Sequence, residues 1–267
     1  MKHGIAGFVF TIVVILMLGG CARGQTVDMY KLPGYIMHAG GVTPDGLAGT
    51  NSIEALNNSY ENGNYWIELD FNQTSDGVWV CLHDWYAYYS EKLTGALVPD
   101  RQTFEKYRTA TYGYESPTLD TLAGWMKEHP LAVIVTDVKD NNPGFVKHIS
   151  ESYPDLADRF VIQIYSRDEY AFVEECGFER IIYTLYKEVP ERRYDTELLR
   201  DFVQSREKLI ALTYAIDPEN ADAIASVAEL GIPLYVHTVN DPQEQALWFE
   251  TGAYGFYSDY KEDADDK

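Results

Sequence analysis

The chain has 267 residues, and its 42 Asp and Glu residues outnumber its 21 Lys and Arg residues, which gives a formal net charge of −21. Such an acidic chain is poorly suited to bind nucleic acids or anionic membranes through a basic face. Its length suits one large α/β domain or two small ones, and no repeat, low-complexity tract or Gly/Ser-rich linker divides it. We therefore expect no nucleic-acid partner, and the sequence gives no sign of an obligate protein partner.

The first twenty residues have the features of a targeting segment. A basic start at Lys2 precedes an apolar run over 5–18, and Leu18-Gly19-Gly20-Cys21 resembles the bacterial lipoprotein lipobox, in which the chain is cut before the Cys and that Cys is acylated. The alternative is an uncleaved membrane anchor, but the run is shorter than the ~20 residues that span a bilayer. We therefore predict a signal peptide over 1–20, lipidation of Cys21, a tether over 21–32 and an extracytoplasmic, membrane-anchored location, either periplasmic or on the outer surface. Cleavage removes one lysine and no acid, so the mature charge is −22.

After the tether, short apolar segments alternate with helical patterns. Enrichment in aromatic and β-branched residues predicts strands at 35–40, 65–71, 78–83, 131–138, 160–165, 180–186, 209–216 and 233–239. Capping residues, Gly and Pro mark helices at 52–62, 118–128, 218–230 and 241–252. The acidic residues 261–267 have the composition of a solvated tail.

Eight strands with helical crossovers in a chain of this size predict a TIM (β/α)₈ barrel over 33–260. Only seven residues separate Asp70 from Val78, too few for a helical crossover, so we expect the barrel to lack the helix between strands 2 and 3. A Tyr-rich stretch at 85–116 reads as an insertion after strand 3. The alternative for 65–83 is a β-hairpin that turns at Asp76-Gly77 and pairs Asp70 with His83.

Polar side chains stand where the predicted strands end, which is where a TIM barrel places its chemistry. They are His38, Glu68, Asp70, His83, Asp137, Lys139 and His237. Two carboxylates buried side by side need a cation, so Glu68 and Asp70 predict a bound metal or a basic partner. Two interpretations remain open for His237, a substrate contact or a core residue. Two also remain open for Lys139, a site residue or only an ion-pair partner of Asp137.

Several motifs resemble those of the glycerophosphodiester phosphodiesterase family. The segments IMHAGG, TNSIEA and IELDFNQTSDGVWVCLHD correspond to the family's His-Arg-Gly, Glu-Asn-Thr, Glu-Leu-Asp, Thr-x-Asp-Gly and His-Asp motifs. Further similarity lies in PTLDTL, TDVK, HTVND and GAYGFYSDY, so the resemblance covers residues 34 to 260. The block over 68–84 is its most specific part.

The resemblance implies a metal-dependent phosphodiesterase on a TIM barrel. Glu68, Asp70 and Asp137 would hold one divalent cation, and three carboxylates suit Ca²⁺ or Mg²⁺ rather than zinc. His38 and His83 would be the general acid and base, and Lys139 would face the phosphate. One imidazole can deprotonate the attacking oxygen while the other protonates the leaving alkoxide. That oxygen is either water or a hydroxyl of the substrate itself, through a cyclic phosphate.

The chain also departs from the family pattern. Ala39 stands where the family has Arg, which removes a bidentate phosphate clamp. Thr50 replaces the Glu of Glu-Asn-Thr, Asp137 replaces a Glu, and His237 replaces a Trp. Loss of the Arg and the Glu together would be charge-balanced if the two positions are neighbours, which is a hypothesis at this point.

The resulting prediction is a lipid-anchored phosphoric diester hydrolase acting on a small-molecule phosphodiester, a glycerophosphodiester or a related phospholipid headgroup ester. Within the same enzyme class, the alternative is a phospholipase-D-like or phosphoinositide-cleaving barrel. From another class, the alternative is a binding lipoprotein that has lost turnover together with the Arg. The presence of both His38 and His83 argues against this last interpretation, because binding alone needs no acid–base pair.

Overall fold

In the computed structural model the described residues are 28–85, 98–109, 113–216, 219 and 221–260. The chain divides into two units, Met1–Leu32 and Pro33–Lys267, and the second contains everything described below. The predicted signal peptide, Cys21, residues 21–27 of the tether, part of the insertion over 85–116 and the tail over 261–267 lie outside the described residues. Among the helices that are described, none is both long and apolar enough to cross a bilayer.

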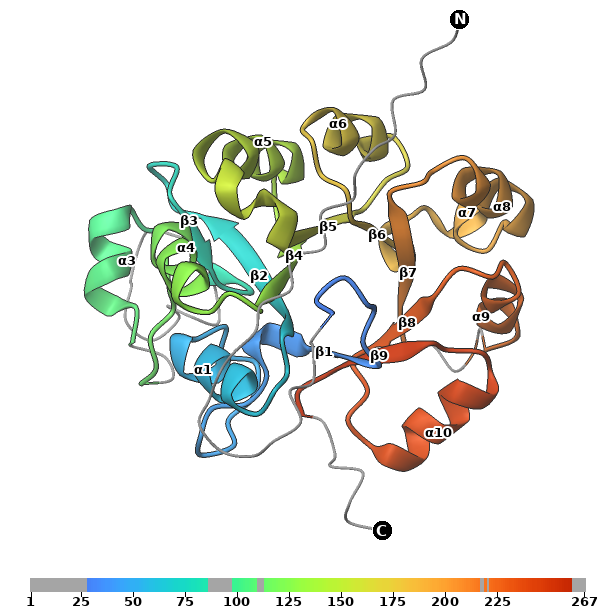
Figure 1. Ribbon diagram of the computed structural model, residues 1–267, viewed down its shortest axis with the longest axis horizontal. Coiled ribbons are helices and arrows are strands. Elements are labelled where there is room, and N and C mark those ends of the chain that lie inside the picture. Colours follow the sequence, from blue (N-terminus) through green and yellow to red (C-terminus); the bar gives the residue numbers. More distant parts are fainter. Residues whose placement is uncertain (1–27, 86–97, 110–112, 217–218, 220, 261–267) are drawn as a thin grey trace, which may run out of the picture. The chain divides into compact units, whose positions relative to one another are not determined.

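Eight parallel strands close into a barrel (Figure 1). They are β1 (Tyr35–Met37), β2 (Trp66–Gln73), β4 (Val133–Val138), β5 (Phe160–Ile164), β6 (Ile181–Thr184), β7 (Leu209–Ala215), β8 (Leu234–His237) and β9 (Gly255–Ser258). Each pairs in parallel with its neighbours, and the ring closes where Met37 of β1 lies opposite Ile67 of β2. The predicted TIM barrel is confirmed.

A helix lies in every connection between consecutive barrel strands, and together these helices surround the sheet (Figure 1). In chain order they are α1 (Ile53–Glu61), α4 (Leu119–Glu128), α5 (Asn142–Ser152), α6 (Glu169–Glu175), α8 (Thr196–Gln204), α9 (Ala221–Ala228) and α10 (Pro242–Glu250). Shorter pieces are α3 (Arg101–Tyr107), α7 (Pro190–Arg193), and the 3₁₀ turns η1 (His38–Gly40), η2 (Pro154–Arg159) and η3 (Leu185–Lys187).

Local sequence explains where these helices begin. The side chains of Ser52 and Thr118 accept hydrogen bonds from the backbone N–H groups of Ala55 and Thr121, and Asp241 caps the start of α10 in the same way. The strands are rich in apolar residues because one face fills the barrel and the other meets the helices. Ile134 and Ile162, for example, are completely buried.

The strand over 79–81 is not part of the barrel. β3 (Trp79–Cys81) pairs antiparallel with β2, with Phe71 opposite Cys81, so the hairpin interpretation of 65–83 is correct and the parallel one is wrong. The connection from β2 to the next barrel strand contains α4, so no helix is missing. The eighth barrel strand is instead β9, a segment of four residues that the sequence analysis did not count as a strand.

The hairpin register differs by one residue from the predicted one. The backbone N–H of Thr74 donates to the carbonyl of Val78 (2.9 Å), which leaves a three-residue loop over 75–77 in place of a two-residue turn. The hydroxyl of Thr74 stabilises this loop because it donates a hydrogen bond to Asp76 Oδ1 and accepts one from the backbone N–H of Val78. Asp70 therefore pairs with Leu82 and not with His83.

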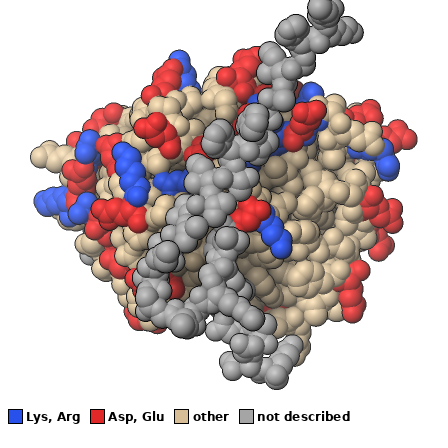
Figure 2. All heavy atoms as spheres, in the orientation of Figure 1, with Lys and Arg blue, Asp and Glu red and all other residues tan. Residues whose placement is uncertain are grey.

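Charged side chains cover the surface of the barrel. Figure 2 shows Asp and Glu residues spread over the face in view, with Lys and Arg residues among them rather than gathered into a single basic patch. This distribution fits the acidic composition of the chain.

Candidate active site

The predicted site residues converge on one cavity of about 120 Å³ at the carboxyl ends of the strands. Its lining includes every predicted residue other than Cys21, namely His38, Glu68, Asp70, His83, Asp137, Lys139 and His237. Gln163, Tyr186 and Tyr257 complete the lining, and the sequence analysis did not single them out. Tyr186 had been taken as part of the predicted strand over 180–186, and Tyr257 lies in β9, which the sequence analysis did not count as a strand.

Three carboxylates form the acidic side of the cavity. Glu68 and Asp70 lie on β2 and Asp137 on β4, where Asp70 and Asp137 are register partners. Oxygen atoms of the three groups lie within 4.8 Å of one another. Glu68 and Asp70 are each only 2% exposed. Burial, followed by the nearby charge of Asp70, raises the pKa of Glu68 to about 8, because a negative charge on Glu68 is poorly solvated and is repelled by Asp70.

Each carboxylate has one oxygen held by an uncharged donor. The three pairs are the backbone N–H of Ala39 with Glu68 Oε2, Asn51 Nδ2 with Asp70 Oδ2, and the Tyr165 hydroxyl with Asp137 Oδ1, all at 2.7 Å. Such outer contacts fix the orientation of metal ligands. Asn51 and Tyr165 were missed by the sequence analysis, although Asn51 is part of the segment TNSIEA that carries the family resemblance.

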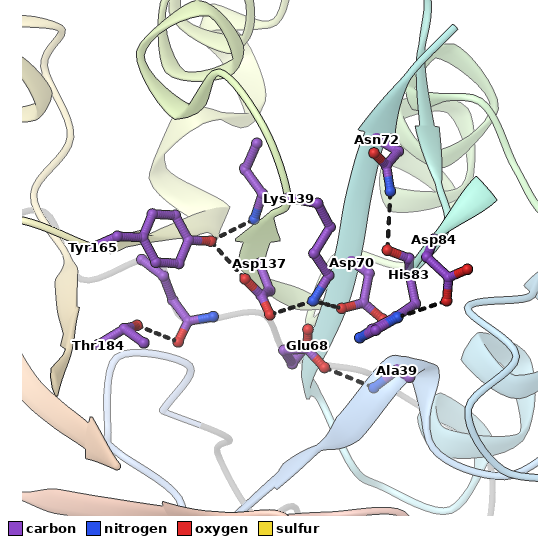
Figure 3. Close-up of polar contacts among 12 residues, drawn as sticks. Ala39, Glu68, Asp70, Asn72, His83, Asp84, Asp137, Lys139, Tyr165 and Thr184 are labelled. Carbon is purple, nitrogen blue, oxygen red and sulfur yellow. Dashed lines mark hydrogen bonds and ion pairs between the residues drawn. The ribbon is translucent and has the colours of Figure 1, made fainter. Parts of the chain in front are cut away.

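Lys139 bridges two of the remaining carboxylate oxygens (Figure 3). Its Nζ lies 2.6 Å from Asp70 Oδ1 and 2.7 Å from Asp137 Oδ2. Burial alone would lower the pKa of Lys139, but attraction by Asp70 and Asp137 outweighs it and raises the pKa. For Asp137, burial acts to raise the pKa, but the charge and the hydrogen bond of Lys139 outweigh it and lower the pKa. Three carboxylates and one ammonium group leave a formal charge of −2.

The donor set fits one divalent cation. All its donors are carboxylate oxygens, which hard ions such as Ca²⁺ and Mg²⁺ prefer, and the local charge of −2 matches that of the ion. The sequence prediction that Glu68, Asp70 and Asp137 come together is therefore met by the geometry of the site.

His38 lies on the opposite side of β2 from β4, at the end of β1, and is held by an acidic residue. Its Nδ1 is 2.8 Å from Asp259 Oδ1, and Asn240 Nδ2 is 2.6 Å from the other oxygen of Asp259. Burial acts to lower the pKa of His38, but Asp259 and the charge of Glu68 outweigh it and raise the pKa to about 9. Asp259 and Asn240 were not predicted as site residues, although both lie in segments that resemble the family.

His83 follows β3 and is the most exposed of these groups, with 62% of its side chain accessible. Its Nδ1 lies 3.2 Å from Asp84 Oδ2. Asn72 of β2 donates to the backbone carbonyls of both Leu82 and His83, each at 3.0 Å (Figure 3). The hairpin thus brings His83 to the cavity from outside the barrel.

Ala39 and Thr50, which replace the Arg and the Glu of the family pattern, lie in two segments that contact each other. Ala39 is buried and has a left-handed backbone (φ 47°), and its carbonyl accepts a hydrogen bond from the N–H of Asn51 (2.9 Å). The neighbouring Thr50 bonds Ser52 through their hydroxyls (2.8 Å). This proximity is what the hypothesis of a joint, charge-balanced loss requires.

A TIM barrel that gathers carboxylates, a lysine and two histidines in one cavity at the carboxyl ends of its strands has the arrangement of an enzyme active site. The chain belongs to the glycerophosphoryl diester phosphodiesterase family, whose sequence pattern matches residues 39–262. The predicted family and the predicted phosphoric diester hydrolase are both confirmed at this level.

Solved structures show the same fold. A glycerophosphodiester phosphodiesterase from Parabacteroides distasonis is 20% identical, covering 85% of this chain and 92% of its own, with a TM-score of 0.61. One from Thermotoga maritima is 17% identical (86% and 96% covered, TM-score 0.58). An Oleispira antarctica phosphodiesterase in complex with the product sn-glycerol-3-phosphate is 16% identical (86% and 94% covered, TM-score 0.60). No curated protein sequence matches the chain.

Proposed function

We propose that the protein hydrolyses a glycerophosphodiester or a related headgroup–phosphate ester with one divalent cation, Ca²⁺ or Mg²⁺. The observation that carries this proposal is the placement of Glu68, Asp70 and Asp137 within 4.8 Å of one another in a cavity that His38 and His83 also line. The small, mostly polar cavity favours a deacylated substrate over an intact phospholipid.

The residues divide the chemistry among them. A cation held by the three carboxylates would polarise a phosphoryl oxygen and offset developing negative charge. Lys139 adds a positive charge at the same place for the phosphate. The two histidines exchange protons with the attacking and leaving oxygens.

The contacts of the two histidines differ, and we assign their roles from this difference. Asp259 accepts a hydrogen bond at Nδ1 of His38 and favours its protonated form, so His38 is the acid that protonates the leaving alkoxide. His83, which is exposed and follows the hairpin, is the base that takes the proton of the attacking hydroxyl or water.

The first experiment measures hydrolysis of glycerophosphodiesters and bis-p-nitrophenyl phosphate by the soluble form from residue 22. Rates are compared in Ca²⁺, in Mg²⁺ and in chelator, for the wild type, His38→Ala and His83→Ala. Turnover that requires metal and falls in both variants is expected with the glycerophosphodiester. Metal binding without turnover of any diester would contradict the enzyme and point to the phospho-ligand-binding lipoprotein.

The same variants separate acid from base. p-Nitrophenolate leaves without needing a proton, so His38→Ala should lose much less activity on bis-p-nitrophenyl phosphate than on a diester with an alkoxide leaving group. His83→Ala should lose activity on both substrates. The reverse pattern would exchange the two roles.

The lipobox-like segment supports a proposed location outside the cytoplasm, with the protein anchored to a bacterial membrane through acylated Cys21. Labelled fatty acid should be incorporated into the full-length chain expressed in bacteria and not into Cys21→Ser. Equal labelling of both forms would rule out this anchor.

A further inference from the structure

Gln163 is a polar residue of the cavity wall to which the proposed reaction assigns no role. It lies on β5, it is only 4% exposed, and it lines the cavity. Its backbone is held on both sides, because its N–H donates to Thr136 Oγ1 (3.3 Å) and its carbonyl accepts a hydrogen bond from Asn142 Nδ2 (3.1 Å). Gln163 therefore has a fixed place in the barrel.

Two hydroxyl groups orient the side-chain amide of Gln163. The hydroxyl of Thr184 on β6 (Figure 3) and that of Tyr257 on β9 both donate to Gln163 Oε1, each at 3.2 Å. An amide oxygen has two lone pairs, so these two bonds engage both of them. The nitrogen Nε2 is then the end of the amide that is left for another partner.

This nitrogen is open to the cavity. Nε2 has no hydrogen-bond partner among the residues that the structure describes, yet it is not one of the unpaired atoms in that part of the chain that are closed to solvent. Because Gln163 is otherwise buried and lines the cavity, the accessible nitrogen faces the cavity. An amide nitrogen donates and does not accept, so it offers the cavity a hydrogen-bond donor without charge.

Gln163 lies beside the carboxylate cluster. Thr136 of β4 is the register partner of Ile162 of β5, so the residues that follow them, Asp137 and Gln163, form the next pair along the two strands. Asp137 is in turn the partner of Asp70 on β2. The three side chains thus stand in one row across neighbouring strands, with Gln163 at the end of the row farther from β2.

A phosphoryl oxygen is the acceptor that suits this donor. A phosphate bound to the proposed cation lies against the carboxylate row, and Gln163 is more deeply buried than His38, Lys139 or His83, so it is placed at the depth of the phosphate. A nonbridging phosphoryl oxygen only accepts hydrogen bonds, as Nε2 only donates them. A hydroxyl group at the same place would leave its own proton unpaired.

We propose that Gln163 is a further catalytic residue, whose Nε2 donates a hydrogen bond to a nonbridging phosphoryl oxygen and stabilises the charge that builds up there in the transition state. The inference rests on the proposed phosphodiesterase and deepens it. Thr184 and Tyr257 are positioning residues that act through Oε1. Fixed donors of this kind typically contribute about 10²- to 10³-fold to kcat.

The test replaces the amide by an uncharged side chain of similar length, Gln163→Met, and uses glycerophosphodiesters with sulfur at one nonbridging position. Sulfur is a weak hydrogen-bond acceptor, so the stereoisomer whose sulfur faces Gln163 has already lost most of the contact. Gln163→Met should slow the ordinary diester and one stereoisomer about 10²- to 10³-fold, and the other stereoisomer less than about tenfold. Equal slowing of both stereoisomers would overturn the proposed contact.

A matched variant separates the donor from the packing around it. Thr184→Val removes one hydrogen bond at Oε1 and keeps the amide, so it should slow the ordinary diester less than about tenfold. Calorimetry should give the same affinity for Ca²⁺ or Mg²⁺ in the wild type and in Gln163→Met, because these hard cations take oxygen ligands. Cation binding that is lost in Gln163→Met and kept in Thr184→Val would overturn the inference.

A binding measurement keeps this inference distinct from the proposed function. If the wild type hydrolyses no diester, the proposed function fails, and calorimetric binding of inorganic phosphate to the metal-loaded protein decides on Gln163. Binding that is weaker by about tenfold in Gln163→Met and less affected in Thr184→Val supports the donor. Equal binding of phosphate by the wild type and Gln163→Met rejects it.

Discussion

Asp259 shows how much of the site depends on residues that need never touch the substrate. Its carboxylate holds His38 Nδ1 at 2.8 Å and accepts a hydrogen bond from Asn240 Nδ2 (2.6 Å), and the backbone N–H of Asp259 donates to Asn240 Oδ1 (2.8 Å). His237 shows the opposite case, a partly buried side chain whose Nε2 atom is inaccessible to solvent and unpaired. Each case leads to a measurable consequence.

Replacing Asp259 by Asn should slow catalysis without weakening substrate binding. The amide keeps the size of the carboxylate but removes the charge that favours protonated His38, so kcat should fall by about 10²-fold, the low end of what a positioned acid or base contributes. Steady-state kinetics at saturating metal should show this fall with KM changed less than about threefold. Asp201→Asn, at an exposed position of α8, is the matched control. A fall in KM and kcat that tracks lost thermal stability would instead indicate a structural role.

The buried, neutral His237 should make the fold sensitive to mild acid. Because its folded-state pKa of about 4 lies below the ordinary value of 6.5, the unfolded chain takes up the proton first as pH falls. The contribution of neutral His237 to the free energy of unfolding is fully present above pH 6.5 and is lost as the pH falls from 6.5 to 4. The loss at pH 5, relative to neutral pH, is about 2 kcal/mol. Urea unfolding at pH 7 and pH 5 should show a smaller drop for His237→Phe than for the wild type. Equal drops would mean that His237 does not titrate in this way.

At the scale of elements, β2 organises the site because it contacts three different segments. The loop before α1 reaches Asp70 through Asn51, β4 brings Asp137 alongside Asp70, and the hairpin with β3 carries His83. The metal ligands and the proposed base thus depend on separate neighbours of one strand.

This separation predicts that two asparagines have different effects. Asn51→Ala removes the donor to Asp70 Oδ2 and should weaken Ca²⁺ or Mg²⁺ binding about 10- to 100-fold, as measured by calorimetry. Asn72→Ala removes the bonds to the carbonyls of Leu82 and His83 and should lower kcat while leaving metal affinity unchanged. If both variants lose metal affinity equally, the hairpin and the metal site are not independent.

At the scale of the whole molecule, the net charge of −21 opposes the approach of an anionic substrate. Figure 2 shows that acidic side chains are widely spread rather than confined to the site. Local positive charge, from Lys139, protonated His38 and the proposed cation, attracts the phosphate once it is close.

Salt should therefore speed the reaction with an anionic diester. Raising the ionic strength from about 10 to about 150 mM shortens the screening length to ~8 Å and should raise kcat/KM for glycerophosphoglycerol by about two- to fivefold at saturating metal. Glycerophosphocholine has no net charge and serves as the control, with little change expected. A fall in rate for the anionic diester would show that the field at the cavity mouth is attractive instead.

Most of the site was predictable because it is local in sequence. Six of its residues lie in or just after parallel barrel strands, whose carboxyl ends meet at the same face: His38, Glu68, Asp70, Asp137, Lys139 and His237. The β2–β3 hairpin brings His83 to the same cavity. Asn51, Tyr165, Asn240 and Asp259 were missed because each acts on a partner between 19 and 221 positions away in the chain. The residues next to such a side chain in the sequence do not show which distant side chain it orients.

The sequence by itself determined the family, the eight-stranded barrel with its helical connections, and the group of residues able to hold a cation and move protons, because alternation, capping and strand-end chemistry are local properties. The tertiary structure alone decided that β3 lies outside the barrel, because it pairs antiparallel with β2 while β4 is the parallel neighbour of β2. It also decided which donors orient each carboxylate and that His237 faces Asp137 across the cavity. These features depend on closure of the sheet, which pairs the first barrel strand with the last where β1 meets β9.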